Sequence, residues 1–320
     1  MLRKVLLSIA ILVGVACLTA AAFVGPYAAR VREFPAEPAR GFHAPFYLYV
    51  SPGAARIAKE GKRVTILVQP NNSGRTSDDA KTHRRDAWWT GFERQRVADE
   101  LNVVLIVPAF IRPATDWRVY THALDRDVLT TKRPDLARLD LQLLAMIDAA
   151  RASLESQRIS SDPRVILQGF SASGMFANRF AALHPHRVKA VAVGSPGGWP
   201  IAPMQVVGSD TLRYPAGVAD LEELTGKPFD LAAWRALPQL IVMGSLDDND
   251  SLDEGDGWDA DASAQVVRLF GRTPIARWPK AEHLYRDAGA NARFLTVAGV
   301  AHDRKALQTY STEFFKTVLH

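Results

Sequence analysis

The hydrophobic and polar positions of the chain form two alternating patterns from about residue 44 onward. Short, nearly uninterrupted apolar runs are separated by longer segments in which apolar residues recur every three or four positions. The first pattern is typical of β-strands that are covered by helices on both faces, and the second is typical of those helices. Together they predict βαβ units around a largely parallel central sheet. The expected strands are Phe46–Val50, Val64–Val68, Val103–Val107, Val165–Leu167, Ala190–Val193, Leu240–Met243 and Phe294–Val297.

Helical spacing is clearest in Leu136–Leu154, and Met175–Leu183 and Leu307–Leu319 are also predicted to be helices. Residues 196–238 differ, because prolines and glycines gather near their start and strand signals are few. We interpret this segment as an excursion between two strands, long enough to contribute part of a substrate pocket.

The N-terminal residues 1–29 have a pattern of their own. Arg3 and Lys4 precede Val5–Ala29, a run without any charged side chain. This pattern predicts an export signal peptide or a membrane anchor helix, with or without cleavage. Residues 30–43 are proline-containing and are predicted to form an extended linker. We therefore expect an exported protein, whether periplasmic, secreted or membrane-anchored, with possible membrane association only through its N-terminal segment.

Composition and charge narrow the classes of function. The 320 residues hold 39 Lys and Arg against 34 Asp and Glu, a net charge of +5, and the basic residues are scattered. Nucleic acid is therefore not expected as a partner. The single cysteine, Cys17, lies in the N-terminal apolar run. The remainder of the chain can form no disulfide, no cysteine-ligated zinc site and no thiolate nucleophile.

One serine stands at a sharp junction between a predicted strand and a predicted helix. The strand ending at Gln168 leads into the six residues 169–174, with Ser171 at the turn. In so tight a turn the residues two before and two after the serine must be small, and Gly169 and Ser173 satisfy this condition. The sequence predicts a nucleophile elbow, with a serine that only caps a helix as the alternative.

An acid and a histidine follow in the order that a catalytic triad in such a sheet requires. A serine hydroxyl is a weak nucleophile, so it needs a base in reach and a carboxylate to hold that base. Asp247 comes three residues after Gly244, at the end of a predicted strand, and His302 follows the last predicted strand. We predict that Ser171, Asp247 and His302 meet at the carboxyl edge of the sheet.

The acidic run after Asp247 leaves other assignments open. Asp250 is the main alternative to Asp247, but it needs a longer loop to reach His302. The run could also bind calcium through clustered carboxylates. It lacks the spacing of an EF-hand loop, so we favour a solvated acidic loop and expect no metal. The further members of the run are Asp248, Asn249, Asp253, Glu254 and Asp256.

Residues 44–320 resemble the α/β-hydrolase superfamily, and within it the exported esterases of the polyhydroxybutyrate-depolymerase-like and feruloyl-esterase-like groups. The elbow, the turn 244–247 and the turn 298–302 carry this resemblance. It implies Ser171 as nucleophile, His302 as general base and then general acid, and Asp247 as the orienting carboxylate, with no cofactor. The implied reaction is hydrolysis of a small-molecule or polymeric ester through an acyl-enzyme. A non-catalytic binding module and an acyltransferase with the same triad are the alternatives.

An oxyanion hole requires two backbone N–H donors. The N–H of Ala172 is the first candidate, and the loop 69–74 should supply the second. Many relatives carry a His-Gly pair in that loop, which is absent here, so Asn71 or Asn72 is chosen by position, against a simple role in forming the turn.

Aromatic side chains offer candidate walls for the substrate. Phe170 and Trp199 are the predicted substrate-binding residues, with packing as the alternative in a chain of seven tryptophans.

Overall fold

The structure of the protein is a computed structural model, and it describes residues 29–319. The predicted signal peptide or anchor lies outside the described residues, apart from Ala29. Within the described range, no helix combines the length and the apolar character needed to cross a bilayer.

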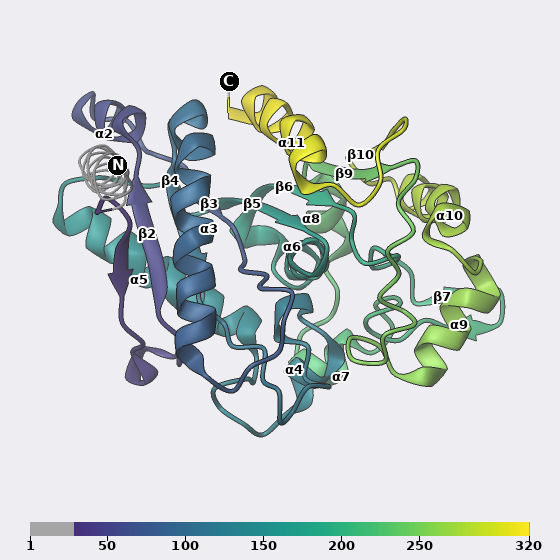
Figure 1. Cartoon of the computed structure of the whole chain (residues 1–320). Helices are drawn as coiled ribbons and strands as arrows, with labels where there is room; N and C mark the ends of the chain where they lie inside the picture. Colours follow the sequence, from purple (N-terminus) through teal and green to yellow (C-terminus); the bar gives the residue numbers. More distant parts are fainter. Residues whose placement is uncertain (1–28, 320) are drawn as a thin grey trace, which may run out of the picture.

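An eight-stranded, mostly parallel sheet forms the centre of the molecule (Figure 1). Its order is β1-β2-β4-β3-β5-β6-β9-β10, and only β1 and β2 pair antiparallel with their neighbours. Every strand expected from the apolar runs overlaps an observed strand. The strands are β1 Arg32–Phe34, β2 Phe46–Val50, β3 Ile66–Val68, β4 Val104–Pro108, β5 Val165–Phe170, β6 Val188–Gly194, β9 Gln239–Gly244 and β10 Ala292–Val297.

The central strands are apolar throughout because both of their faces are buried. In β5, Val165 and Leu167 belong to the hydrophobic layer on one face of the sheet. Ile166, between them, belongs to the layer on the other face. Since successive side chains of a strand point to opposite faces, an uninterrupted apolar run is what a sheet covered on both sides requires.

Helices cover both faces of the sheet (Figure 1). α3 (Ala80–Leu101) and α11 (Arg304–Leu319) pack on one face, and α5 (Leu139–Ser156), α6 (Ala172–Leu183) and α10 (Pro274–Asp287) contribute to the layer on the other. The shorter helices are α2 Pro52–Lys59, α4 Arg126–Thr130, α7 Leu221–Thr225, α8 Leu231–Ala236 and α9 Ala260–Phe270, together with the 3₁₀ turns η1 Pro38–Arg40, η2 Thr121–Ala123 and η3 Pro185–Arg187.

The segment predicted as an extended linker, residues 30–43, packs onto the domain instead. β1 pairs with β2, and the Phe34 ring stacks on Phe46 with 4.8 Å between the ring centroids. Val31 and Phe42 are both buried. The linker prediction is wrong because these apolar side chains find partners at the edge of the sheet, so the folded domain begins before residue 44.

Residues 196–238 leave the sheet between β6 and β9, as the proline and glycine pattern indicates. They hold a short antiparallel pair, β7 (Val206–Val207) with β8 (Asp210–Thr211), followed by α7 and α8. With residues of α9 and α10 they enclose a small hydrophobic cluster of their own around Trp199 and Leu212.

Candidate active site

Ser171 lies in a strained turn between β5 and α6. Its backbone dihedrals are φ 57° and ψ −127°, in a region that non-glycine residues rarely adopt and that costs about 1–3 kcal/mol. The Ser171 N–H donates to the carbonyl of Gly194 at 2.9 Å, which ties the turn to β6. Such strain persists only where the surrounding structure imposes it, and it raises the serine above the edge of the sheet as an elbow does.

The size restrictions expected around the serine have a visible cause. A Cβ atom added at Gly169 would lie 1.9 Å from the backbone oxygen of Ser173, so no larger residue fits there. Ser173 itself closes the turn with its side chain. Its hydroxyl accepts from the Phe170 N–H at 3.0 Å and donates to the Phe170 carbonyl at 2.9 Å. A serine at this position therefore reinforces the elbow.

His302 and Asp247 are hydrogen-bonded. The Nδ1 atom of His302 lies 3.0 Å and 3.1 Å from the two carboxylate oxygens of Asp247, which is 1% exposed. Burial disfavours the charged form of this carboxyl, but the hydrogen-bonded imidazole of His302 holds its pKa below the usual range. An ionised carboxylate at Nδ1 leaves Nε2 of the imidazole free to act as a base.

The histidine stands beside the elbow. The ring centroids of His302 and Phe170, the residue before the nucleophile candidate, are 4.5 Å apart. Both Ser171 and His302 are half-buried, so a substrate can reach them from solvent. The hydroxyl of Ser171 has no hydrogen-bond partner within residues 29–319. A hydrogen bond between a catalytic serine and its histidine often forms fully only when substrate binds.

The loop that carries His302 is bound to the loop that carries Asp247. β9 and β10 pair with each other in parallel, and Gly244 and Val297 are their last paired residues. Beyond that pair, the Leu246 N–H donates to the carbonyl of Val300 at 2.9 Å. A Cβ atom at Gly244 would lie 2.1 Å from the Val300 oxygen. The glycine turn therefore lets the two loops approach closely enough for the acid to reach the imidazole.

Two other acids of the run 247–256 have partners elsewhere. Asp250 pairs with the buried guanidinium of Arg277, and Asp256 pairs with Arg112. In the described part of the chain, no group of three or more His, Cys, Asp or Glu side chains is placed to hold a metal ion. Asp250 and Asp256 are thus held in two separate ion pairs rather than in one cluster.

The loop after β3 lies next to the elbow because β3 and β5 are neighbours in the sheet. Backbone N–H groups of Ala172, Asn71 and Asn72 have no acceptor among the described residues. The side chain of Asn71 is buried and bonded to both backbone polar groups of Phe110, at 2.9 Å and 3.1 Å. It ties this loop to the one after β4, whereas Asn72 is half-buried and lines an open cleft.

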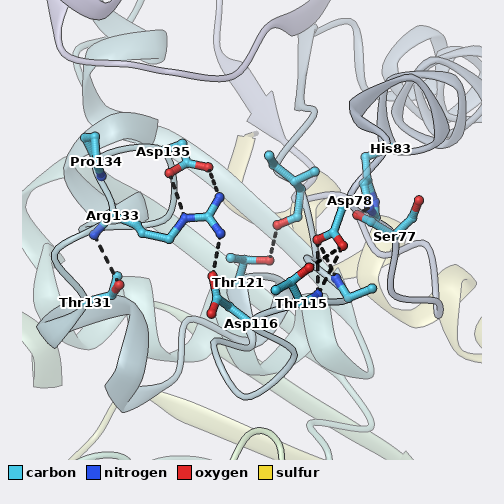
Figure 2. Close-up of polar contacts among 12 residues, drawn as sticks. Ser77, Asp78, His83, Thr115, Asp116, Thr121, Thr131, Arg133, Pro134 and Asp135 are labelled. Atoms are coloured by element: carbon cyan, nitrogen blue, oxygen red, sulfur yellow. Dashed lines mark hydrogen bonds and ion pairs between the residues drawn. The ribbon is translucent and has the colours of Figure 1, made fainter.

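Further from the sheet, a polar network joins the loop after β3 to the loop after β4 (Figure 2). The sequence did not predict this network. Asp78 accepts from the Thr115 N–H at 3.1 Å and from its hydroxyl at 2.6 Å. Nε2 of His83, on α3, lies 2.9 Å from the carbonyl oxygen of Ser77. The loop that carries Asn72 is thereby fixed from both sides. Asp78 sits just before a helix, where an acid is ordinarily taken for a cap.

The two aromatic candidates differ. Phe170 is half-buried beside His302 and lines the cleft next to the elbow. Trp199 is 1% exposed, donates its indole N–H to the carbonyl of Ala216, and stacks on Phe270 with 4.2 Å between centroids. Trp199 is therefore a packing residue of the excursion, and its prediction as a substrate-binding residue is wrong.

The parallel sheet, the serine elbow after β5, the acid after β9 and the histidine after β10 define the α/β-hydrolase fold, and the expected resemblance is confirmed at this level. Poly(aspartic acid) hydrolase-1 from Sphingomonas sp. KT-1 is similar, with a TM-score of 0.56 and 19% identity over 88% of this chain and 97% of that one. The poly(3-hydroxybutyrate) depolymerase LpqC from Bordetella parapertussis has a TM-score of 0.53 and 20% identity over 89% and 88%. Mycobacterium tuberculosis MPT51 has a TM-score of 0.54 and 13% identity over 90% and 97%.

No protein-family model matches the sequence, and no curated protein is similar to it in sequence. At identities this low, the similarity to solved structures establishes the fold alone. A shared fold does not by itself assign a reaction, because the residues of the site determine the chemistry.

Proposed function

We propose that the protein is a cofactor-independent serine hydrolase that cleaves a carboxylic ester through an acyl-enzyme intermediate. The observation that carries this proposal is the bond from His302 Nδ1 to the buried Asp247 carboxylate, beside a serine in a strained elbow. A core packing role requires neither the strained dihedrals nor a half-exposed imidazole held on a buried carboxylate. The strained dihedrals cost stability, and both features serve nucleophilic catalysis.

In the first half of the reaction, Nε2 of His302 removes the hydroxyl proton of Ser171 while the oxygen attacks the ester carbonyl. The negative charge that develops on the carbonyl oxygen is stabilised by the N–H groups of Ala172 and, in our proposal, Asn72. His302 then gives its proton to the departing alkoxide, which leaves as an alcohol. Asp247 keeps its charge throughout and stabilises the imidazolium.

In the second half, water replaces the alcohol. His302 removes a proton from the water molecule as its oxygen attacks the acyl carbonyl on Ser171. The tetrahedral intermediate collapses, the proton passes to the serine oxygen, and the carboxylic acid leaves. Both halves use the same groups, so no further component is needed.

The decisive experiment replaces Ser171 with alanine. Ser171→Ala should keep the fold, measured by circular dichroism and urea unfolding, and lower p-nitrophenyl butyrate turnover by about 10⁶-fold. A fluorophosphonate probe should label the wild type and not this variant. Ser156→Ala, an exposed serine near the end of α5, is the control and should change neither property. Turnover that survives in Ser171→Ala would contradict the assignment.

We further propose that the protein is exported, on the strength of Arg3 and Lys4 followed by the uncharged run 5–29. Fractionation of cells that express the full chain tests this. Recovery of the intact chain in the cytosol would contradict it.

A further inference from the structure

A cleft of about 280 Å³ lies beside the elbow. The loop after β3 contributes Asn72 to its wall, and the elbow contributes Phe170. The helices α3 and α11 contribute Trp89, Arg94 and Arg304. The cleft therefore joins the candidate oxyanion loop to a surface with both aromatic and cationic side chains.

Arg94 is the unusual member of this wall. It is 3% exposed, yet among residues 29–319 its guanidinium donates only to the neutral amide oxygen of Gln308 on α11. Its Nε has no hydrogen-bond partner among the described residues. Burial, and then repulsion from Arg304, lower its pKa to about 10, so the guanidinium is still charged at neutral pH. A buried cation without a carboxylate is costly unless an anion can pair with it.

The other charges at the cleft are already paired. Arg304 contacts Glu93 at 2.9 Å, and Nε of Arg75 lies 4.0 Å from Asp86. These four side chains sum to no net charge. Of the charged side chains that the structure describes in this wall, Arg94 is therefore the one without an opposite partner.

We propose that the cleft is a subsite for a free carboxylate of the substrate, which pairs with Arg94. The inference rests on the proposed function and adds a substrate class, namely esters that carry a second, ionised carboxyl group. A guanidinium matches a carboxylate geometrically because it can donate two parallel hydrogen bonds. Trp89, which is 50% exposed, and Phe170 supply apolar walls for the part of the substrate between the ester and the carboxylate.

The test compares matched esters. Mono-p-nitrophenyl adipate and p-nitrophenyl hexanoate have acyl chains of equal length and differ in the terminal carboxylate. We expect kcat/KM at low ionic strength to favour the adipate ester by about tenfold or more, and added salt to reduce this ratio. A second pair, 4-acetoxybenzoate and its methyl ester, places the carboxylate on the alcohol side. The pair that shows the preference identifies which side of the ester enters the cleft.

Variants assign the preference to Arg94. Arg94→Gln should bring the ratio close to one, and Arg94→Lys should keep part of it. Gln308→Glu places a carboxylate beside Arg94 within the protein, so it should abolish the preference even if Arg94→Gln fails to fold. Arg96→Gln is the control, since Arg96 is exposed on the same helix and does not line the cleft. A ratio of two rates on one enzyme is insensitive to general losses of activity.

The outcomes separate the two proposals. Turnover of neutral esters with a ratio near one in the wild type, or a preference that persists in Arg94→Gln and Gln308→Glu, would overturn the subsite and leave the esterase proposal standing. If no ester is turned over, the esterase proposal fails, and the subsite is tested by binding alone. Benzoate should then quench tryptophan fluorescence more than benzamide does, and Gln308→Glu should remove the difference. Equal quenching by both would overturn the subsite as well.

Discussion

A methyl group added at Gly244 should displace His302 without unfolding the protein. The added Cβ atom would lie 2.1 Å from the backbone oxygen of Val300 and 2.6 Å from that of Ala301. Ordinary contact begins at about 3.4 Å, so the loop must move by about 1.3 Å, and a misplacement of about 1 Å can already cost about 10²-fold in rate. Because φ at Gly244 lies outside the left-handed region, alanine adds no backbone strain of its own.

We therefore expect Gly244→Ala to lower kcat for p-nitrophenyl butyrate by about 10²-fold and the free energy of unfolding by about 1–3 kcal/mol. Gly289→Ala is the matched control. Its φ is +71° and nothing lies within 4 Å of the added Cβ, so it should cost about 1 kcal/mol through the backbone and leave kcat unchanged. Steady-state kinetics and urea unfolding measure both quantities. A folded Gly244→Ala variant with wild-type kcat would refute the argument.

Three further predictions concern aspartate side chains. Asp247→Asn should lower kcat by about 10⁴-fold with the fold intact, because an amide no longer holds the required tautomer of His302. Asp250→Asn leaves the buried Arg277 without its carboxylate and should mainly lower the free energy of unfolding, by about 3–5 kcal/mol in urea unfolding. If Asp250→Asn instead abolished activity and Asp247→Asn only lowered stability, Asp250 would be the carboxylate that orients His302. Burial raises the pKa of Asp125 to about 7, although two backbone N–H bonds oppose the shift. Since an unfolded aspartate has a pKa of about 3.9, the wild type should lose stability relative to Asp125→Asn as the pH rises from about 4 to about 7. A difference in the free energy of unfolding between the two proteins that stays constant over that range would contradict the raised pKa of Asp125.

The strands were predictable because a strand that is buried on both faces needs apolar residues at successive positions, and such runs are visible in the sequence. The helix α3 was not, because its buried positions include His83, Gly91, Arg94 and Gln95. Because polar residues and a glycine occupy these buried positions, the helix lacks the apolar spacing by which helices are found. A periodicity argument fails where a helix buries polar side chains.

Parts of the candidate site were predictable from the sequence and parts were not. The positions of Ser171, Asp247 and His302 follow from local turns at strand ends, which a sequence displays, while their catalytic roles stay predictions. The role of Asn71 depends on Phe110, 39 residues away, and the burial of Trp199 depends on Phe270. Contacts between distant segments leave no local pattern.

The short strand β1 also has a consequence for handling the protein. It pairs with β2 and covers the backbone groups that β2 would otherwise expose. Uncovered sheet edges pair readily with other chains and promote aggregation. A shortened form for expression should therefore start upstream of Val31, because a cut at residue 44 would remove that protection and reduce the soluble yield.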